Sequence, residues 1–242
     1  MSMAHRITEV VVVIPAHNEE GLVVGCLRSL MAAIVQTRSL LSSAAPRLRV
    51  ILVADGCTDR TVDYALAFPE VTVLEQPSRG VGSARRAGIN YALRSTLAAT
   101  RSVWIINTDA DTRVAENWIS EHLRVAGRGV DLLIGAVRPD FDDLSVQQVA
   151  AWLHSHPGGR PSGHTHGANL GIRGNVYRAI GGFADLDEHE DVDLVDRARK
   201  RGARIVATDT VEVVTSGRQT GRTPGGYARY LREELEIIVA NN

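Results

Sequence analysis

Four short apolar runs, separated by helix-like segments, constrain the fold of this sequence more than any other feature. The runs cover residues 10–14, 50–54, 71–74 and 103–107, and each is apolar without alternation. Such strands are typical of a mostly parallel sheet that is buried on both faces. The sequence therefore predicts an α/β fold with right-handed strand–helix–strand crossovers and a ligand site beyond the carboxyl ends of the strands.

Helical periodicity fills the intervals between these runs. The expected helices cover residues 20–35, 58–66, 82–97 and 115–125. Asn18 is the expected N-cap of the first of them. The second half is less regular, and its expected elements are a strand over 131–137, a loop over 154–166, a charged helix over 190–201, a mobile loop over 216–226 and a final helix over 227–238.

Composition and charge fit one domain over residues 1–242. The chain is 44% hydrophobic and 23% charged, without a break that would divide it. A formal net charge of -1 provides no basic field for nucleic acid, and two cysteines cannot form a disulfide framework. The run at residues 10–14 is too short to span a membrane. We expect a cytoplasmic protein that binds no nucleic acid and has no transmembrane segment; peripheral membrane contact and the oligomeric state stay open.

Polar residues follow three of the four early strands. The first strand ends in residues 15–20, the second in Asp55-Gly56, and the fourth in Asp109-Ala110-Asp111. Because parallel strands end at the same edge of a sheet, we expect these side chains to lie close together. Carboxylate oxygens are the ligands that Mg²⁺ or Mn²⁺ prefers, and such an ion neutralises phosphate charge. These acidic residues therefore predict a site for a diphosphate and a divalent metal ion at the carboxyl edge of the sheet.

The spacing of Asp109 and Asp111 is weak evidence by itself. The same spacing recurs at Asp140/Asp142, Asp185/Asp187 and Asp191/Asp193. Position carries the information, because only the first pair directly follows a buried run. The alternative is a solvated turn in which Asp111 or Thr112 caps the next helix, and Asp55-Gly56 alone is equally ordinary turn chemistry.

Taken together, these segments resemble family 2 glycosyltransferases of the GT-A fold. The resemblance extends in order and spacing to about Thr215, through residues 14–20, 53–61, 80–89, 109–111, 167–173, 181–183 and 190–194. It implies a Rossmann-like, mixed, mostly parallel sheet flanked by helices. It also implies a nucleotide-sugar-binding half over residues 1–112 and an acceptor-binding half over residues 113–242.

The resemblance implies which residues hold the donor. Those expected at the nucleotide base are Pro15, Ala16, His17, Asp55 and Arg85. Those expected near the ribose or the sugar are Glu19, Asp109 and Ala110. Asp111 is implied as the ligand of a Mg²⁺ or Mn²⁺ ion that bridges the two phosphates and stabilises the leaving group.

On the acceptor side, the resemblance implies Asp191 as the general base, which takes the proton of the attacking hydroxyl in an inverting transfer. Glu190 is expected to contact the acceptor, and Gly167, Ala168 and Asn169 to form the floor of its pocket. One alternative is that the acids at the start of residues 190–201 simply match the helix macrodipole. The other is that the floor is a plain strand with a glycine-rich entry.

Two departures from the family pattern concern the base and the metal. Ala54 stands where the family has a first aspartate, and Cys57 replaces a serine. The histidine that completes the metal site in many relatives is missing from residues 214–218. Arg218 and Arg222 are expected to supply positive charge to the diphosphate from a closing loop; the alternative is a solvated basic loop.

Two histidine pairs, His154/His156 and His164/His166, suggest zinc, but their spacing is not that of a helix face and no cysteine is near. We expect this segment, together with Trp152, to border the acceptor pocket instead.

The expected activity is the metal-dependent, inverting transfer of a sugar from a UDP- or GDP-activated donor to an unidentified acceptor hydroxyl. The alternatives are a retaining enzyme of the same fold and a non-catalytic domain that binds sugar nucleotides. A nucleotidyltransferase would carry a glycine-rich loop with a lysine after the first strand, and an NAD-binding protein a G-x-G-x-x-G there. Residues 15–20 have neither.

Overall fold

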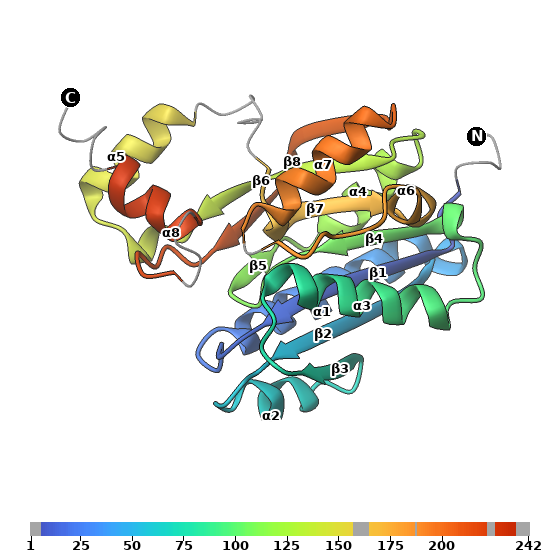
Figure 1. The fold of residues 1–242 in the computed structure, drawn as a ribbon, viewed down its shortest axis with the longest axis horizontal. Coiled ribbons are helices and arrows are strands. Elements are labelled where there is room, and N and C mark those ends of the chain that lie inside the picture. The colour runs from blue at the N-terminus through green and yellow to red at the C-terminus, as the bar shows by residue number, and fades with distance from the viewer. Residues whose placement is uncertain (1–5, 157–164, 187, 222–225, 236–242) are drawn as a thin grey trace.

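The computed structural model describes residues 6–156, 165–186, 188–221 and 226–235. Its centre is an eight-stranded sheet with the order β3-β2-β1-β4-β7-β6-β8-β5 (Figure 1). The strands are β1 (Glu9–Ala16), β2 (Arg47–Asp55), β3 (Val71–Gln76), β4 (Val103–Asn107), β5 (Thr112–Val114), β6 (Leu132–Pro139), β7 (Leu170–Arg173) and β8 (Ile205–Thr215).

Strands β1 to β4 form a parallel half of this sheet. β7 runs antiparallel to both β4 and β6, β8 runs parallel to β6, and β5 runs antiparallel to β8. The predicted mixed, mostly parallel α/β sheet is therefore confirmed.

Helices cover both faces of the sheet. They are α1 (Val23–Leu41), α2 (Thr61–Leu66), α3 (Val81–Ser95), α4 (Trp118–Ala126), α5 (Val146–Ser155), α6 (Gly174–Ala179), α7 (Glu190–Lys200) and α8 (Tyr227–Arg229), the last continued by a π-helical turn, Tyr230–Glu234. Val10 and Val12 of β1 pack in the layer that holds α1 and α4, whereas Val11 and Val13 face α3 and α7. Side chains of a strand alternate between faces, so burial of both faces explains why the strand is apolar throughout.

The start of α1 corrects one prediction. The helix begins at Val23, and Asn18 has a positive φ of 52° instead of serving as the N-cap. Its side-chain oxygen accepts a hydrogen bond from the Thr58 backbone N at 2.8 Å. Asn18 therefore ties the end of β1 to the turn after β2, both of which border the site.

Several short elements from residue 112 onward are absent from the prediction. β5 and β7 have three and four residues, too few for periodicity to be recognised. β5 also corrects the alternative in which Asp111 or Thr112 caps a helix, since the chain enters a strand there. Helix α5 precedes the expected loop and carries a sequence signal, the capping box between Ser145 and Gln148. Residues 157–164 of that loop lie outside the described part.

None of the helices in the described ranges is long and apolar enough to cross a membrane.

Candidate functional site

One pocket of about 980 Å³ opens at the carboxyl ends of β1, β2 and β4 and at the end of β8. It has the size of a typical small-molecule site. The predicted site residues that line it are Pro15, Ala16, His17, Glu19, Asp55, Arg85, Asp109, Ala110, Asp111, Gly167, Ala168, Glu190, Asp191 and Arg218. Asn169 does not line it, and Arg222 lies outside the described residues.

Asp55, at the end of β2, organises the loop that follows β3. One of its carboxylate oxygens accepts hydrogen bonds from Gln76 Nε2 at 2.7 Å and from the Arg79 backbone N at 2.9 Å. The other accepts from the Gly80 backbone N at 2.9 Å. An ionised carboxylate offers about four acceptor positions. Hydrogen bonds within the protein occupy three of these positions, so one acceptor position of Asp55 remains for a nucleotide base.

The end of β1 is tied to the same turn. The ring Nδ1 of His17 donates to the carbonyl oxygen of Asp55, and the Cys57 thiol donates to the carbonyl oxygen of Ala16 at 3.4 Å. A thiol thus makes a bridge at the position where the family pattern has a serine. The two strand ends form one joined wall of the pocket.

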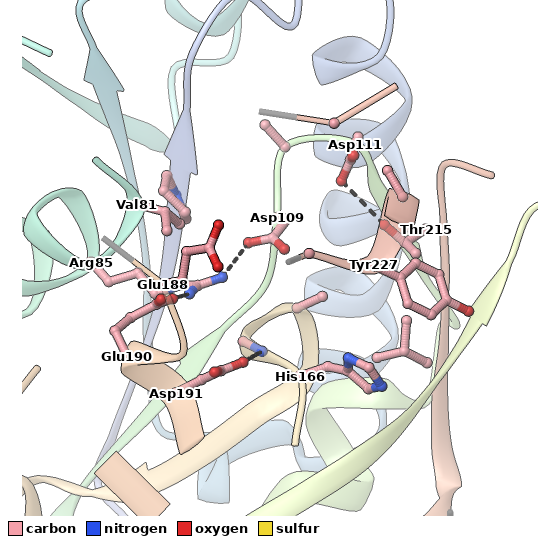
Figure 2. A pocket seen from close by; sticks show the side chains of 18 of the residues that line it. Val81, Arg85, Asp109, Asp111, His166, Glu188, Glu190, Asp191, Thr215 and Tyr227 are labelled. Carbon is pink, nitrogen blue, oxygen red and sulfur yellow. Dashed lines mark hydrogen bonds and ion pairs between the residues drawn. The ribbon is translucent and has the colours of Figure 1, made fainter. Parts of the chain in front are cut away.

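Arg85, on α3, joins two acids that come from different parts of the chain. Its buried guanidinium donates to Asp109 at 2.6 Å and to Glu190, as Figure 2 shows. Burial favours the neutral form of Arg85, but the carboxylates of Asp109 and Glu190 outweigh it and raise its pKa. A Cβ on Gly167 would lie 2.3 Å from this guanidinium, so a larger residue there would have to displace Arg85 from its two acids. Arg85, predicted at the nucleotide base, lines the pocket and already donates hydrogen bonds to these two acids.

Removing Arg85 is expected to destabilise the protein strongly. Arg85→Ala leaves Glu190, 5% exposed, without its cation, and breaking a buried pair in this way costs about 3–5 kcal/mol in the free energy of unfolding. Arg86→Ala is the matched control, because its pair with Asp185 is exposed and 3.7 Å long, and should cost less than about 1 kcal/mol. Urea unfolding followed by circular dichroism measures both; equal losses would contradict the structural role.

Asp111 is held by the strand ends around it. Its Oδ1 accepts from Thr215 Oγ1 at 3.2 Å, as Figure 2 shows. The same oxygen accepts from Thr112 Oγ1 at 3.3 Å, and Oδ2 pairs with Arg218 at 2.9 Å. Burial and the charge of Asp109 raise the pKa of Asp111 to about 6, while Arg218 opposes the rise. Sequence reasoning missed Thr215, although it ends a strand at the same edge as the predicted acids.

Glu19 and Arg218 form a bidentate pair. Arg218 Nη1 donates to Glu19 Oε2 at 3.0 Å, and Nη2 donates to Oε1 at 2.8 Å. The Glu19 backbone N donates to Thr61 Oγ1 at 2.7 Å, which fixes this acid from behind. Glu19, predicted near the ribose, therefore faces the arginine that was predicted to meet the diphosphate.

Asp191 lies in the first turn of α7, on the side of the pocket opposite Asp111 (Figure 2). Its Oδ2 accepts a hydrogen bond from the Gly167 backbone N at 2.6 Å. This bond orients the carboxylate toward the pocket. His189, two positions earlier at the N-cap of α7, has a left-handed backbone with φ 61° that turns the chain into the helix. Asp191 and Asp111 thus face one cavity, as the sequence predicts.

Asn169 corrects the predicted acceptor floor. It is fully buried, and its amide nitrogen donates to the carbonyl oxygens of Ala136 and Val211, while its oxygen accepts from Trp118 Nε1 at 3.1 Å. His122 completes this network, and burial lowers its pKa to about 3. Asn169 joins β6, β8 and α4 beneath the pocket. Its contacts therefore favour the alternative of a plain strand with a glycine-rich entry over a direct contact with the acceptor.

Aromatic side chains form one wall of the pocket. The ring centroids of His166 and Tyr227 lie 5.3 Å apart, and those of Tyr227 and Tyr230 lie 5.8 Å apart. His156 stacks on Trp152 with centroids 4.4 Å apart. The histidine-containing segment was predicted to border the pocket together with Trp152. His156 and His166 do line the pocket, whereas Trp152 does not line it and packs against His156. The tyrosines had no sequence signal beyond their place in the expected final helix.

The pocket is rich in negative charge. Its described lining has two guanidinium groups, Arg85 and Arg218, and seven carboxylates, those of Glu19, Asp55, Asp109, Asp111, Glu188, Glu190 and Asp191. No group of three or more histidine, cysteine, aspartate or glutamate side chains that could hold a metal ion occurs among the described residues. The protein alone therefore offers an acidic pocket without a complete metal cage.

The fold is shared with solved glycosyltransferases of the GT-A type. Mannosyltransferase PcManGT from Pyrobaculum calidifontis, in complex with GDP-Man and Mn²⁺, matches with a TM-score of 0.60 at 22% identity, over 97% of this chain and 72% of that one. Glucosyl-3-phosphoglycerate synthase from Mycobacterium tuberculosis, in complex with Mg²⁺ and uridine diphosphate, matches with a TM-score of 0.57 at 19% identity, over 98% and 80%. This chain therefore has the GT-A fold.

The family follows from the sequence itself. The profile described as glycosyl transferase family 2 matches residues 11–183, so the chain belongs to that family. A Bacillus subtilis protein named "Probable glycosyltransferase YdaM" is 27% identical over 222 residues, 83% of this chain and 49% of that protein. The chain spans about half the length of this curated relative.

Proposed function

We propose that this chain transfers a sugar from a UDP- or GDP-activated donor to an acceptor hydroxyl, with a divalent metal ion and with inversion at the anomeric carbon. One observation carries the proposal: Asp55, Asp109, Asp111 and Asp191, from three separate segments, line a single pocket large enough for a nucleotide sugar. The family of the chain supports the reaction class. The GDP-Man and uridine diphosphate present in the two similar structures support the donor class.

A divalent cation suits the charge of this pocket. A diphosphate would meet seven carboxylates and two guanidinium groups that are already paired with acids, so its entry needs further positive charge. Asp111, with its buried carboxylate, would hold Mg²⁺ or Mn²⁺, and the diphosphate and water would complete the coordination. When bound, the ion neutralises charge on the leaving diphosphate.

The first strand ends bind the nucleotide in this proposal. The base lies against Pro15, Ala16 and His17, and its N–H donates to the free acceptor position of Asp55, where an ionised partner strengthens the hydrogen bond. Asp109, whose carboxylate is about one-third exposed, faces the sugar. Arg222 joins Arg218 at the diphosphate.

Asp191 is the general base. Its carboxylate takes the proton of the acceptor hydroxyl as that hydroxyl attacks the anomeric carbon, while the diphosphate leaves from the opposite face. The Gly167 backbone N holds the carboxylate in one orientation, which keeps it aimed during the transfer. Glu190, fixed by Arg85, borders the acceptor beside it.

The acceptor lies between Asp191 and the aromatic wall. Figure 2 has His166 and Tyr227 on the side of the pocket away from Arg85. Aromatic rings offer a large apolar surface with few rotatable bonds, so they orient a bound molecule at low entropic cost. Gly167 and Ala168 line the pocket beside Asp191, and the reacting hydroxyl lies against them in this proposal.

Donor hydrolysis tests this function without knowledge of the acceptor. The full chain is incubated with UDP- and GDP-sugars, with Mn²⁺ and with EDTA, and release of the nucleoside diphosphate is measured. We expect metal-dependent release from one donor class. A donor that raises the melting temperature without any turnover, in the presence of a wide acceptor set, would favour the non-catalytic alternative. Once an acceptor is found, NMR of the product distinguishes inversion from retention; retention would make Asp191 a binding residue.

A further inference from the structure

The guanidinium of Arg218 lies where a metal ion would approach Asp111. It makes two hydrogen bonds to Glu19, at 2.8 and 3.0 Å, and its Nη2 also lies 2.9 Å from Asp111 Oδ2. The other oxygen of Asp111 accepts from two threonine hydroxyls. Both oxygens of Asp111 and both oxygens of Glu19 therefore have partners within the protein.

The backbone beside Arg218 is anchored, whereas its side chain has room to move. The Ser216 backbone N donates to the Asp111 carbonyl oxygen at 3.1 Å, and the Gly217 backbone N donates to Asp143 Oδ2 at 2.8 Å. A Cβ on Gly217 would lie 2.7 Å from the Asp140 carbonyl oxygen, so the close approach requires glycine. The Arg218 side chain is 37% exposed. The guanidinium can therefore leave Asp111 without movement of its own backbone.

These contacts determine how a cation can reach Asp111 when no nucleotide sugar is bound. A divalent ion that approaches Asp111 alone meets a positive charge already paired there, and must displace it. A diphosphate alters the balance, because its oxygens accept hydrogen bonds from the guanidinium and coordinate the metal together. Binding of the metal and binding of the diphosphate are then coupled, and each strengthens the other by the same factor.

We propose that Arg218 excludes divalent metal from the pocket in the absence of donor, so that the ion enters only together with the donor diphosphate, and that Glu19 is the residue that positions Arg218 for this role. The coupling rests on the proposed function, whereas the exclusion rests on the Glu19–Arg218–Asp111 contacts alone. Once the donor is bound, the arginine becomes a ligand of the diphosphate.

Mn²⁺ binding to the full chain, measured by electron paramagnetic resonance with and without UDP or GDP, tests the proposal. Without nucleotide, Arg218→Gln is expected to bind Mn²⁺ more tightly than the wild type by about fivefold or more. With nucleotide, the wild type should gain much more Mn²⁺ affinity than Arg218→Gln does. Arg218→Lys, which keeps the charge, should bind Mn²⁺ without nucleotide as weakly as the wild type.

Two controls make the outcomes distinct. Arg113→Gln removes an arginine that pairs with Asp140 at 2.6 Å outside the pocket, and should leave Mn²⁺ binding unchanged. Melting curves of each variant verify that it is folded. Equal Mn²⁺ affinity of wild type and Arg218→Gln without nucleotide would overturn the exclusion, even if nucleotide binds. Tighter Mn²⁺ binding by Arg218→Gln, with no binding of any nucleoside diphosphate, would support the exclusion and refute the proposed donor.

Discussion

Asp191→Asn is expected to lower kcat for sugar transfer by about 10²–10⁴-fold, the contribution that a positioned general base makes. The change keeps the size of the side chain, and an amide oxygen still accepts the hydrogen bond from the Gly167 backbone N. Donor binding should therefore change little, and the loss should appear in kcat. Initial rates at saturating donor and acceptor measure this directly.

Asp193→Asn is the control for this prediction. Asp193 lies on the same helix, pairs with Arg197 at 2.6 Å and does not line the pocket. Its replacement removes an i,i+4 pair and should leave the rate within a factor of two or so, since such pairs contribute about 0.3–0.5 kcal/mol to stability. If Asp191→Asn retained wild-type kcat, Asp191 would not be the base, and the inverting mechanism proposed for it would fail.

Asp111→Asn is expected to lower the metal-dependent rate by about 10²–10³-fold, the usual loss when one group that stabilises the leaving charge is removed. A neutral amide is a weak ligand for Mg²⁺ or Mn²⁺, so the variant should also need more metal for half-maximal activity. Asn retains hydrogen-bonding groups for Thr215 and Arg218, which favours a folded variant. Rates over a Mn²⁺ titration separate loss of metal affinity from loss of turnover.

Asp142→Asn tests whether spacing or position matters. Asp140 and Asp142 have the same spacing as Asp109 and Asp111, but Asp142 is exposed and outside the pocket. Its replacement should leave the Mn²⁺ titration unchanged. Equal losses in the two variants would contradict the assignment of Asp111 as the metal ligand.

The parallel half of the fold and its strand ends could be predicted because the signals are local. A strand buried on both faces is apolar throughout, and its carboxyl end is followed at once by the residues that border the pocket. Asp109 and Asp111 could be distinguished from three other pairs of equal spacing only because β4 precedes them. The place of this pair after a buried strand identifies it as a candidate site, whereas its spacing alone does not.

Contacts between residues that lie far apart in the sequence could not be predicted in this way. Glu19 and Arg218 lie 199 positions apart, and no periodicity relates them. β7 is short, and Asn169 before it satisfies buried carbonyl groups of β6 and β8 that only the folded sheet brings together. Arg85 looks like a donor-binding arginine in the sequence, yet its burial between Asp109 and Glu190 follows from helix α3 packing beneath them.

The crystal structure of the full chain with Mn²⁺ and UDP or GDP tests the central claim most directly. We expect an anomalous peak for manganese at Asp111, the diphosphate beside Arg218, and the base against β1 and Asp55. The β-phosphate, to which the sugar is attached in the donor, should face Asp191 across the pocket. A nucleotide bound elsewhere, or manganese away from Asp111, would contradict the account.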